Sequence, residues 1–459
     1  MKKLTMAAAL VLSLHSSFAQ STSTDSNTKK EVVPFEGQDQ TWQNGSDRRT
    51  ETVLQSKYFT GSFIFDGNYN YSFNNPNDNT IVGSTAVARH NEMEVMFVGL
   101  GGDFNYNNAR GRVMLQFGNR SITVPRNDYS PYRGQYDLTD AYRYFSEAYG
   151  GYHFALGRTS VNVDAGLFMS YVGLNSYYQV ENWEYQASFT SDNTPWFFNG
   201  MRIQIFPSNK LKIEPWIING WQSYGKFNSM PGLGANLTWC PSEKMKLLTN
   251  DYYGADAATI PDRKRFHSDN SLLVRYYHRP ASKGISMMAF SLTGDVGFET
   301  GGGVNGFNDK DSAKGPAQYF LSGMVYNRIW FNQNKFACTV GGGFMTNPGR
   351  YLVLYPPGDA SPLPSPLDPT KTQGTHPFDT NPGTQFHGWD CSANLDWMPN
   401  QSLTVRLEFV HRHSDVPYFA GHGGVTSPSG YVTTSIPAGW APDLVKSEDR
   451  IMFVVLFRI

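Results

Sequence analysis

The feature that most constrains this chain is an alternation of apolar and polar residues with a period of two, which begins at Tyr58 and returns to the end. In one clear case Leu403, Val405 and Leu407 alternate with polar Thr404, Arg406 and Glu408. Such alternation predicts β-strands with one apolar face and one wet face. We expect about sixteen strands, near residues 58–73, 92–106, 109–118, 146–156, 160–171, 196–206, 210–221, 231–240, 244–253, 266–279, 285–298, 317–331, 334–345, 385–397, 402–412 and 448–459.

The connections between these segments alternate between short and long. Seven are tight turns, such as Asn107-Asn108 and Gly157-Arg158, and eight are mostly longer, near 74–91, 119–145, 172–195, 222–230, 254–265, 299–316, 346–384 and 413–447. Seven turns and eight loops fit an all-β, antiparallel, up-and-down transmembrane barrel with both ends on the tight-turn side, short periplasmic turns and long extracellular loops. A soluble antiparallel sandwich, the alternative, has no reason to keep its long loops on one side.

Composition agrees with a barrel and excludes other classes. Aromatic residues make up 15% and charged residues 17%, whereas about a quarter of a soluble domain is usually charged. The mean hydropathy of −0.43 excludes a polytopic helical membrane protein. A net charge of −1 gives no case for nucleic acid. The prior of about three domains that length suggests is therefore replaced by one barrel.

The N-terminus predicts export. Residues 1–19 read as a cleaved signal peptide, with Lys2 and Lys3 before an apolar run and Ala19 at the cut. Residues 20–57 read as a polar linker or small periplasmic plug, and 58–459 as the barrel. The first cysteine is Cys240, so no lipid anchor is expected, and the three distant cysteines are expected as free thiols.

Aromatic residues recur just before the tight turns. These residues predict a girdle at the periplasmic membrane interface, and ordinary cross-strand packing is the alternative. The predicted girdle residues are Tyr106, Phe154, Phe206, Trp239, Trp330 and Trp397. The last segment, which ends in Phe457 and Ile459, resembles the terminal strand by which barrel-assembly machinery recognises its clients. Outer-membrane lipid and that machinery are therefore expected partners.

If the apolar face meets lipid, the opposite face lines the interior. The expected pore-lining residues carry both signs of charge: Asp66, Arg112, Glu147, Asp164, Arg202, Gln204, Asp295, Arg328, Asp390, Asp396, Arg406, Glu408 and Arg412. Sixteen strands enclose enough space for an aqueous channel, although salt-bridged filling of a closed barrel is the alternative. The segment Leu174 to Pro195 is a candidate constriction loop whose Glu181, Glu184 and Asp192 would face lumenal arginines; an external loop is the other interpretation. The proline-rich loop 346–384 is expected to be extended.

Several local strings resemble the OmpL-like β-barrel porin family of Gram-negative bacteria, particularly its Bacteroidetes-type members. They are NYNYSFNNP at 68–76, RHNE at 89–92, FMSYVGLNSY at 168–177, ENWEYQ at 181–186, INGWQ at 218–222 and FHSDNS at 266–271. The resemblance covers most of the mature chain. It implies a porin in the outer membrane but identifies no solute.

The sequence contains few features that indicate an enzymatic or metal site. The cluster His411 to Asp415, with His422 nearby, could bind a metal or act as a base, but polar residues at the membrane rim explain it more simply. Asn308 to Asp311 lacks the Gly and Glu of a calcium loop. No GxSxG, HExxH or phosphate loop occurs. No cofactor and no metal are expected.

The sequence therefore predicts a passive outer-membrane channel for small hydrophilic solutes. A homotrimer is expected by analogy with porins only. The alternatives are a surface receptor or adhesin with a closed lumen, and a hydrolase that uses His411 to Asp415. About 440 mature residues exclude a TonB-dependent transporter, whereas a hydrophobic-substrate channel with 20–57 as a hatch remains open.

Overall fold

Sixteen long strands form one closed antiparallel barrel in the computed structural model. The structure describes residues 30–125, 128, 130, 134–226, 228, 230–256, 260–306, 317–348, 364–365, 368–372, 386–426 and 440–459. The barrel strands are β1 (Phe59–Ser72), β2 (Glu92–Tyr106), β3 (Ala109–Phe117), β4 (Phe145–Leu156), β5 (Thr159–Met169), β6 (Phe197–Ser208), β7 (Leu211–Ile218), β8 (Gly232–Ser242), β9 (Met245–Gly254), β10 (Lys264–His278), β11 (Ile285–Thr300), β12 (Tyr319–Phe331), β13 (Phe336–Asn347), β16 (Phe386–Trp397), β17 (Leu403–Ser414) and β20 (Ser447–Arg458).

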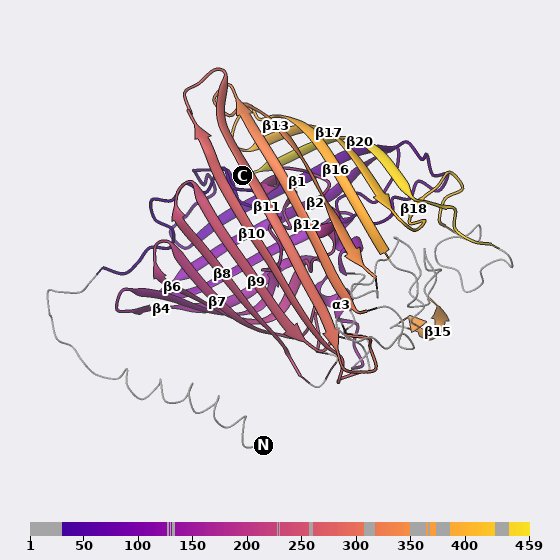
Figure 1. Cartoon of the computed structure of the whole chain (residues 1–459). Helices are drawn as coiled ribbons and strands as arrows, with labels where there is room; N and C mark the ends of the chain where they lie inside the picture. Colours follow the sequence, from indigo (N-terminus) through magenta and orange to yellow (C-terminus); the bar gives the residue numbers. More distant parts are fainter. Residues whose placement is uncertain are drawn as a thin grey trace.

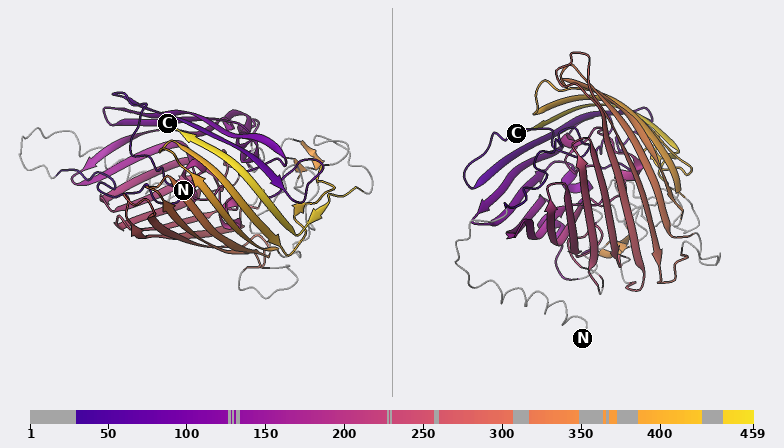
Figure 2. Two further views of the ribbon diagram at one scale, coloured as in Figure 1. Left: turned by 90° about the horizontal axis from the view of Figure 1, so that it is seen from above. Right: turned by 60° about the vertical axis from the view of Figure 1, so that its left-hand side comes forward.

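Each strand pairs with its neighbour in sequence, and β1 pairs with β20 to close the sheet. Figures 1 and 2 show the tilted strands wrapping into a single tube, with the C-terminal strands beside β1. The predicted fold class and the sixteen predicted segments are confirmed. The boundaries of β2 agree at both ends, and β7 ends three residues earlier than predicted, at Ile218.

The short and long connections lie at opposite ends of the barrel, which we call the turn end and the loop end. Seven short connections and the outer ends of β1 and β20 lie at the turn end. Asn107 and Asn108 form one such connection with φ of 48° and 67°, and Asn332 begins another with φ of 49°. Asn tolerates this left-handed backbone better than most residues, which is why it occurs in two-residue hairpin turns.

Small elements occupy the connections. They are α2 (Arg120–Thr123), α3 (Leu138–Tyr142), η3 (Gln179–Glu181), α4 (Phe189–Asp192), and the two-stranded pairs β14 (Pro364–Ser365) with β15 (Asp368–Thr372) and β18 (Phe419–Ala420) with β19 (Leu444–Val445). Among the described residues, no helix is long and apolar enough to span a membrane. The signal-peptide prediction and most of the predicted proline-rich loop 346–384 lie outside the described residues.

The two faces of each strand differ as the alternation predicts. On β17, the outward side chains of Leu407 and Phe409 are 47% and 44% exposed. The inward side chains of Arg406 and Glu408, which alternate with them, are 2% and 0% exposed. The outer surface of the barrel is a belt of Leu, Val, Ile and aromatic residues, and the ionic groups lie inside. This arrangement suits a lipid environment, because the hydrocarbon core offers charged groups no hydrogen-bond partner.

Lysine at Leu407, near the middle of β17, is expected to destabilise the barrel in lipid by about 2–4 kcal/mol, because it places a charge near the bilayer midplane. Lysine at Leu403, the first residue of β17, lies near the interface and should cost no more than about 1 kcal/mol. Urea unfolding in lipid vesicles measures both. Equal costs for the two variants would show that the outer belt does not meet hydrocarbon.

Candidate functional site

The connection between β5 and β6, residues 170–196, folds into the barrel interior, and we call it the inward loop. Its Trp183, Tyr185 and Phe189 are 3%, 0% and 1% exposed. The loop carries η3 and α4 and contacts the walls formed by β1, β12, β16, β17 and β20. The loop adds its own aromatic side chains to those that the strands already place inside, and Tyr177 and Tyr178, for example, pack on Phe97 of β2.

The tip of the inward loop is fixed by one carboxylate. Glu408 of β17 accepts hydrogen bonds from the backbone N–H groups of Tyr185 and Gln186, both at 2.7 Å. The hydroxyl of Tyr185 donates to Asp66 of β1, also at 2.7 Å. A buried carboxylate needs such donors, and a buried loop backbone needs such acceptors, so the two satisfy each other.

The three acidic constriction candidates have different partners. Asp192 pairs with Arg412 at 3.1 Å, and Glu181 pairs with Arg458. Glu184 instead accepts hydrogen bonds from the amides of Asn175 at 2.5 Å and Asn44 at 3.3 Å. Burial raises the pKa of Glu184 to about 7, against the effect of the Asn175 hydrogen bond. Burial also raises the pKa of Asp192, whereas Arg412 lowers it.

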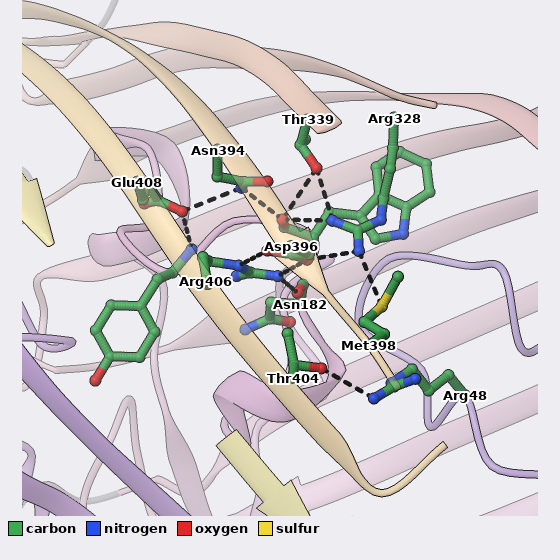
Figure 3. A network of polar contacts seen from close by, with 12 residues as sticks. Arg48, Asn182, Arg328, Thr339, Asn394, Asp396, Met398, Thr404, Arg406 and Glu408 are labelled. Atoms are coloured by element: carbon green, nitrogen blue, oxygen red, sulfur yellow. Dashed lines mark hydrogen bonds and ion pairs between the residues drawn. The ribbon is translucent and has the colours of Figure 1, made fainter. Parts of the chain in front are cut away.

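A second set of contacts surrounds Asp396 of β16, as Figure 3 shows. Arg406 donates to its carboxylate through Nε at 2.6 Å and Nη2 at 2.8 Å, and Arg328 donates through Nη2 at 2.6 Å. The guanidinium of Arg328 also donates to the carbonyl of Trp183 at 3.1 Å. The wall therefore presents two arginines that share one carboxylate and hold the inward loop by its backbone.

Of the further predicted pore-lining residues, Arg112 and Arg202 lie on the opposite wall, whereas Asp295 and Asp390 lie on or beside the strands of the Asp396 cluster. Arg112 pairs with Glu147 at 2.5 Å, and Arg202 pairs with Asp164 at 3.1 Å while lying over the rings of Tyr149, Phe168 and Trp216. Two further positions, Gln204 and Asp295, also face the interior, and the first donates to Glu214 at 2.6 Å. Asp390 accepts from the backbone N–H of Phe189 at 2.8 Å. All thirteen predicted positions thus point inward, while their role in lining a conducting pore stays a prediction.

Residues 30–57, the N-terminal segment, lie across the turn end. The indole of Trp42 donates to the carbonyl of Glu243, and Arg48 donates to the carbonyls of Asn400 and Leu403. Asn44 accepts from the backbone N–H of Trp183 at 2.8 Å. These contacts join two turn-end hairpins, β8–β9 and β16–β17, to the inward loop. The sequence left open whether the segment is a linker or a plug.

Two of the six girdle assignments are wrong. Phe206 is 5% exposed and lies 6.1 Å from Phe35 of the N-terminal segment, and Trp330 is 5% exposed and lies 5.5 Å from Trp183. Residues two apart on a strand share a face, so Phe206 points inward with Gln204, and Trp330 points inward with Arg328. Tyr106, Phe154, Trp239 and Trp397 lie outside, with exposures of 60%, 43%, 44% and 48%.

Some interior residues were not assigned a site role from the sequence. Arg450 of β20 donates to Gln186, and Arg458 pairs with Glu181; their alternation with outward Ile451 and Phe457 was the available signal. Arg120 of α2 donates to the carbonyl of Tyr177 and lies over its ring. Nothing in local sequence places Arg48 or Arg120 in the lumen, because both lie outside the alternating segments.

The histidine cluster lies on the outer side of the loop end. His411 bonds Asp449 at 2.8 Å, whereas His413 bonds Ser447 at 2.7 Å. The carboxylate and the hydroxyl thus contact different imidazoles, so they form no Ser-His-Asp relay. No group of three or more potential metal ligands occurs among the described residues, and all three cysteines are free.

A closed sixteen-stranded barrel with an apolar outer belt and an ionic interior defines an outer-membrane β-barrel protein. The chain belongs to the family described as "Putative beta-barrel porin-2, OmpL-like", which it matches over residues 58–436. The predicted family, the porin function and the outer-membrane location are confirmed.

The fold is similar to that of a solved outer membrane channel. The outer membrane channel DcaP of Acinetobacter baumannii is 10% identical, with a TM-score of 0.50 over 89% of this chain and 100% of that chain. OprB of Pseudomonas putida is 9% identical, with a TM-score of 0.48 over 87% of this chain and 94% of that chain. A search of curated proteins found no matching sequence.

Proposed function

We propose that this porin passes small hydrophilic solutes by passive diffusion along a lumen whose width the inward loop sets. The observation that carries the proposal is the double hydrogen bond from the loop tip to Glu408, which holds residues 170–196 across the interior. Ionic side chains on the opposite wall, such as Arg112, Asp164 and Arg202, favour polar solutes over apolar ones. Residues 30–57 act in this proposal as a plug at the turn end, and the barrel catalyses no reaction.

A receptor or adhesin with a closed lumen is the second candidate. It is favoured by the burial of the inward loop together with the contact of Asn44 with Trp183, which joins the loop to the N-terminal segment. Such a protein would bind its partner with the long connections at the loop end. The two candidates differ in whether the inserted barrel conducts.

Planar-bilayer recording of the purified protein is expected to show stepwise, voltage-tolerant conductance. Liposome swelling should show uptake of small neutral sugars that falls steeply as the sugar becomes larger. A barrel that is properly inserted but electrically silent would overturn the channel and favour the receptor. Alanine at both His411 and His413 should leave conductance unchanged, because these side chains lie on the outer side; a hydrolytic activity lost in that variant would instead support an enzyme.

Two partner predictions belong to this proposal. A homotrimer is testable by native mass spectrometry of the purified protein. Recognition of the last strand by barrel-assembly machinery rests on β20, which places Ile451, Phe453 and Phe457 on one face. Polar residues at Phe453 and Phe457 should slow assembly in cells more than they reduce stability in lipid.

A further inference from the structure

A cavity of about 380 Å³ lies at the turn end, between the N-terminal segment, the inward loop and the strands β12, β16 and β17. Arg48, Trp183, Arg328, Trp330, Lys335 and Arg406 are among its lining residues. Its volume falls in the range of small-ligand sites, which is about 300–1,000 Å³. The position of the cavity at one mouth of the barrel makes it reachable by a solute that enters from that side.

The cavity carries an excess of positive charge. Four cationic side chains line it, namely Arg48, Arg328, Lys335 and Arg406. Two of its acidic residues are paired with arginines that do not line it, Asp39 with Arg275 and Glu181 with Arg458. Asp396 is left to offset the four cations, and both of its oxygens are already engaged by Arg328 and Arg406.

Two buried guanidinium nitrogens of residues that line the cavity have no hydrogen-bond partner among the described residues. They are Nη1 of Arg406, a residue only 2% exposed, and Nε of Arg48. Burial, and next the positive charge of Arg328, lower the pKa of Arg48 to about 10, so it stays cationic at neutral pH. Buried donors of this kind are normally satisfied, and an unsatisfied one calls for an acceptor.

The arrangement of these arginines is shown in Figure 3, where Arg406 and Arg328 flank Asp396 and Arg48 approaches beside Thr404. The three guanidinium groups come from the N-terminal segment and from two separate strands, β12 and β17. Guanidinium groups recognise oxyanions through paired N–H donors, which gives both affinity and orientation. The indole rings of Trp183 and Trp330, 5.5 Å apart, add an apolar wall to the same cavity.

We propose that this cavity binds a small organic or inorganic anion through a carboxylate or phosphate group, held by Arg48, Arg406 and Lys335. The inference rests on the proposed channel, because it makes the cavity a solute-binding step at the turn end and predicts a preference for anionic solutes. Carboxylate and phosphate share the chemistry of two or more acceptor oxygens, so the titrations below use one compound of each kind.

Isothermal titration calorimetry of the full mature protein in detergent tests the proposal. Inorganic phosphate and succinate are titrated separately in a chloride buffer, and at least one is expected to bind saturably. Arg48→Gln and Lys335→Gln should each weaken that binding about tenfold, since a hydrogen bond to a charged group contributes about 1.5–3 kcal/mol and each 1.4 kcal/mol is tenfold. Lys335 lies in a tight turn outside the N-terminal segment, so its variant keeps the test valid if Arg48→Gln displaces that segment.

The matched controls are Arg49→Gln and Lys283→Gln. Arg49 is adjacent to Arg48 but pairs with Asp47, and Lys283 lies in the neighbouring tight turn. Both controls should bind like the unaltered protein. Absence of binding by both anions, or equal affinity in Lys335→Gln and Lys283→Gln, would overturn the anion site.

The two proposals fail separately. A conducting barrel that binds neither anion would keep the channel and remove the site. A silent barrel that binds phosphate or succinate would keep the site and remove the channel.

Discussion

Replacing Val180–Asp192 by a short Gly-Ser linker is expected to raise the single-channel conductance at least about threefold, toward that of an unobstructed sixteen-stranded barrel. The deletion removes Trp183, Tyr185 and α4 from the lumen, which leaves Glu408 and Arg412 facing water. The loop contributes its own buried aromatics to the interior and no strand, so the barrel sheet should stay closed. Planar-bilayer recording measures the conductance, and liposome swelling with larger sugars measures the exclusion limit.

A point variant separates loss of the loop from loss of its attachment. Glu408→Gln turns one acceptor oxygen into an NH₂ group that opposes a backbone donor of Tyr185 or Gln186, so it should loosen the loop and produce fluctuating, larger openings. Glu214→Gln is the matched control, because Glu214 of β7 is equally buried but contacts Gln204, Lys212 and Trp216. An unchanged conductance in the loop replacement would show that residues 180–192 do not set the width.

Asp396→Asn is expected to destabilise the folded barrel by about 3–5 kcal/mol, the usual cost of removing one partner from a buried ionic cluster. The carboxylate is shared by Arg328 and Arg406, which are 4% and 2% exposed, and neither cation can turn out to water. With Asp396 neutral, two like charges face each other in the interior. Urea unfolding in lipid vesicles, followed by tryptophan fluorescence, measures the free energy of unfolding.

Asp103→Asn is the matched control. Asp103 pairs with Arg112 at 2.7 Å, but its side chain is 43% exposed, and Arg112 keeps Glu147 as a partner. Exposed pairs contribute at most about 1 kcal/mol, so the control should lose little. Similar losses for the two variants would show that the interior around Asp396 is well hydrated and that the cluster is not a buried one.

The strands and their order could be predicted because, along a barrel strand, the type of each residue follows the environment that its side chain meets. On β17 the outward Leu407 and the inward Arg406 differ in type because one meets lipid and the other does not, and this contrast is local. The tight turns could also be predicted from local sequence, since Asn107 and Asn108 adopt positive φ values that few other residues tolerate.

The girdle predictions for Phe206 and Trp330 are wrong because the position of a residue along a strand does not say which face of the sheet its side chain points to. Trp330 stands near a tight turn, as an interface residue would, yet it shares a face with Arg328 and packs on Trp183. The partner that makes an inward Trp favourable lies 147 residues away in sequence, on the inward loop. Local pattern carries no information about such a partner.

The sequence by itself determined the barrel, its strand number, the two faces and the separation of turns from loops, because each of these follows from interactions within a strand or between adjacent strands. Only the tertiary structure decided what fills the lumen. The contacts of Glu408 with Tyr185, of Asp192 with Arg412 and of Arg48 with Thr404 join residues more than 200 positions apart. They form only after the sheet has closed, when polar groups left inside without water must find partners across the interior.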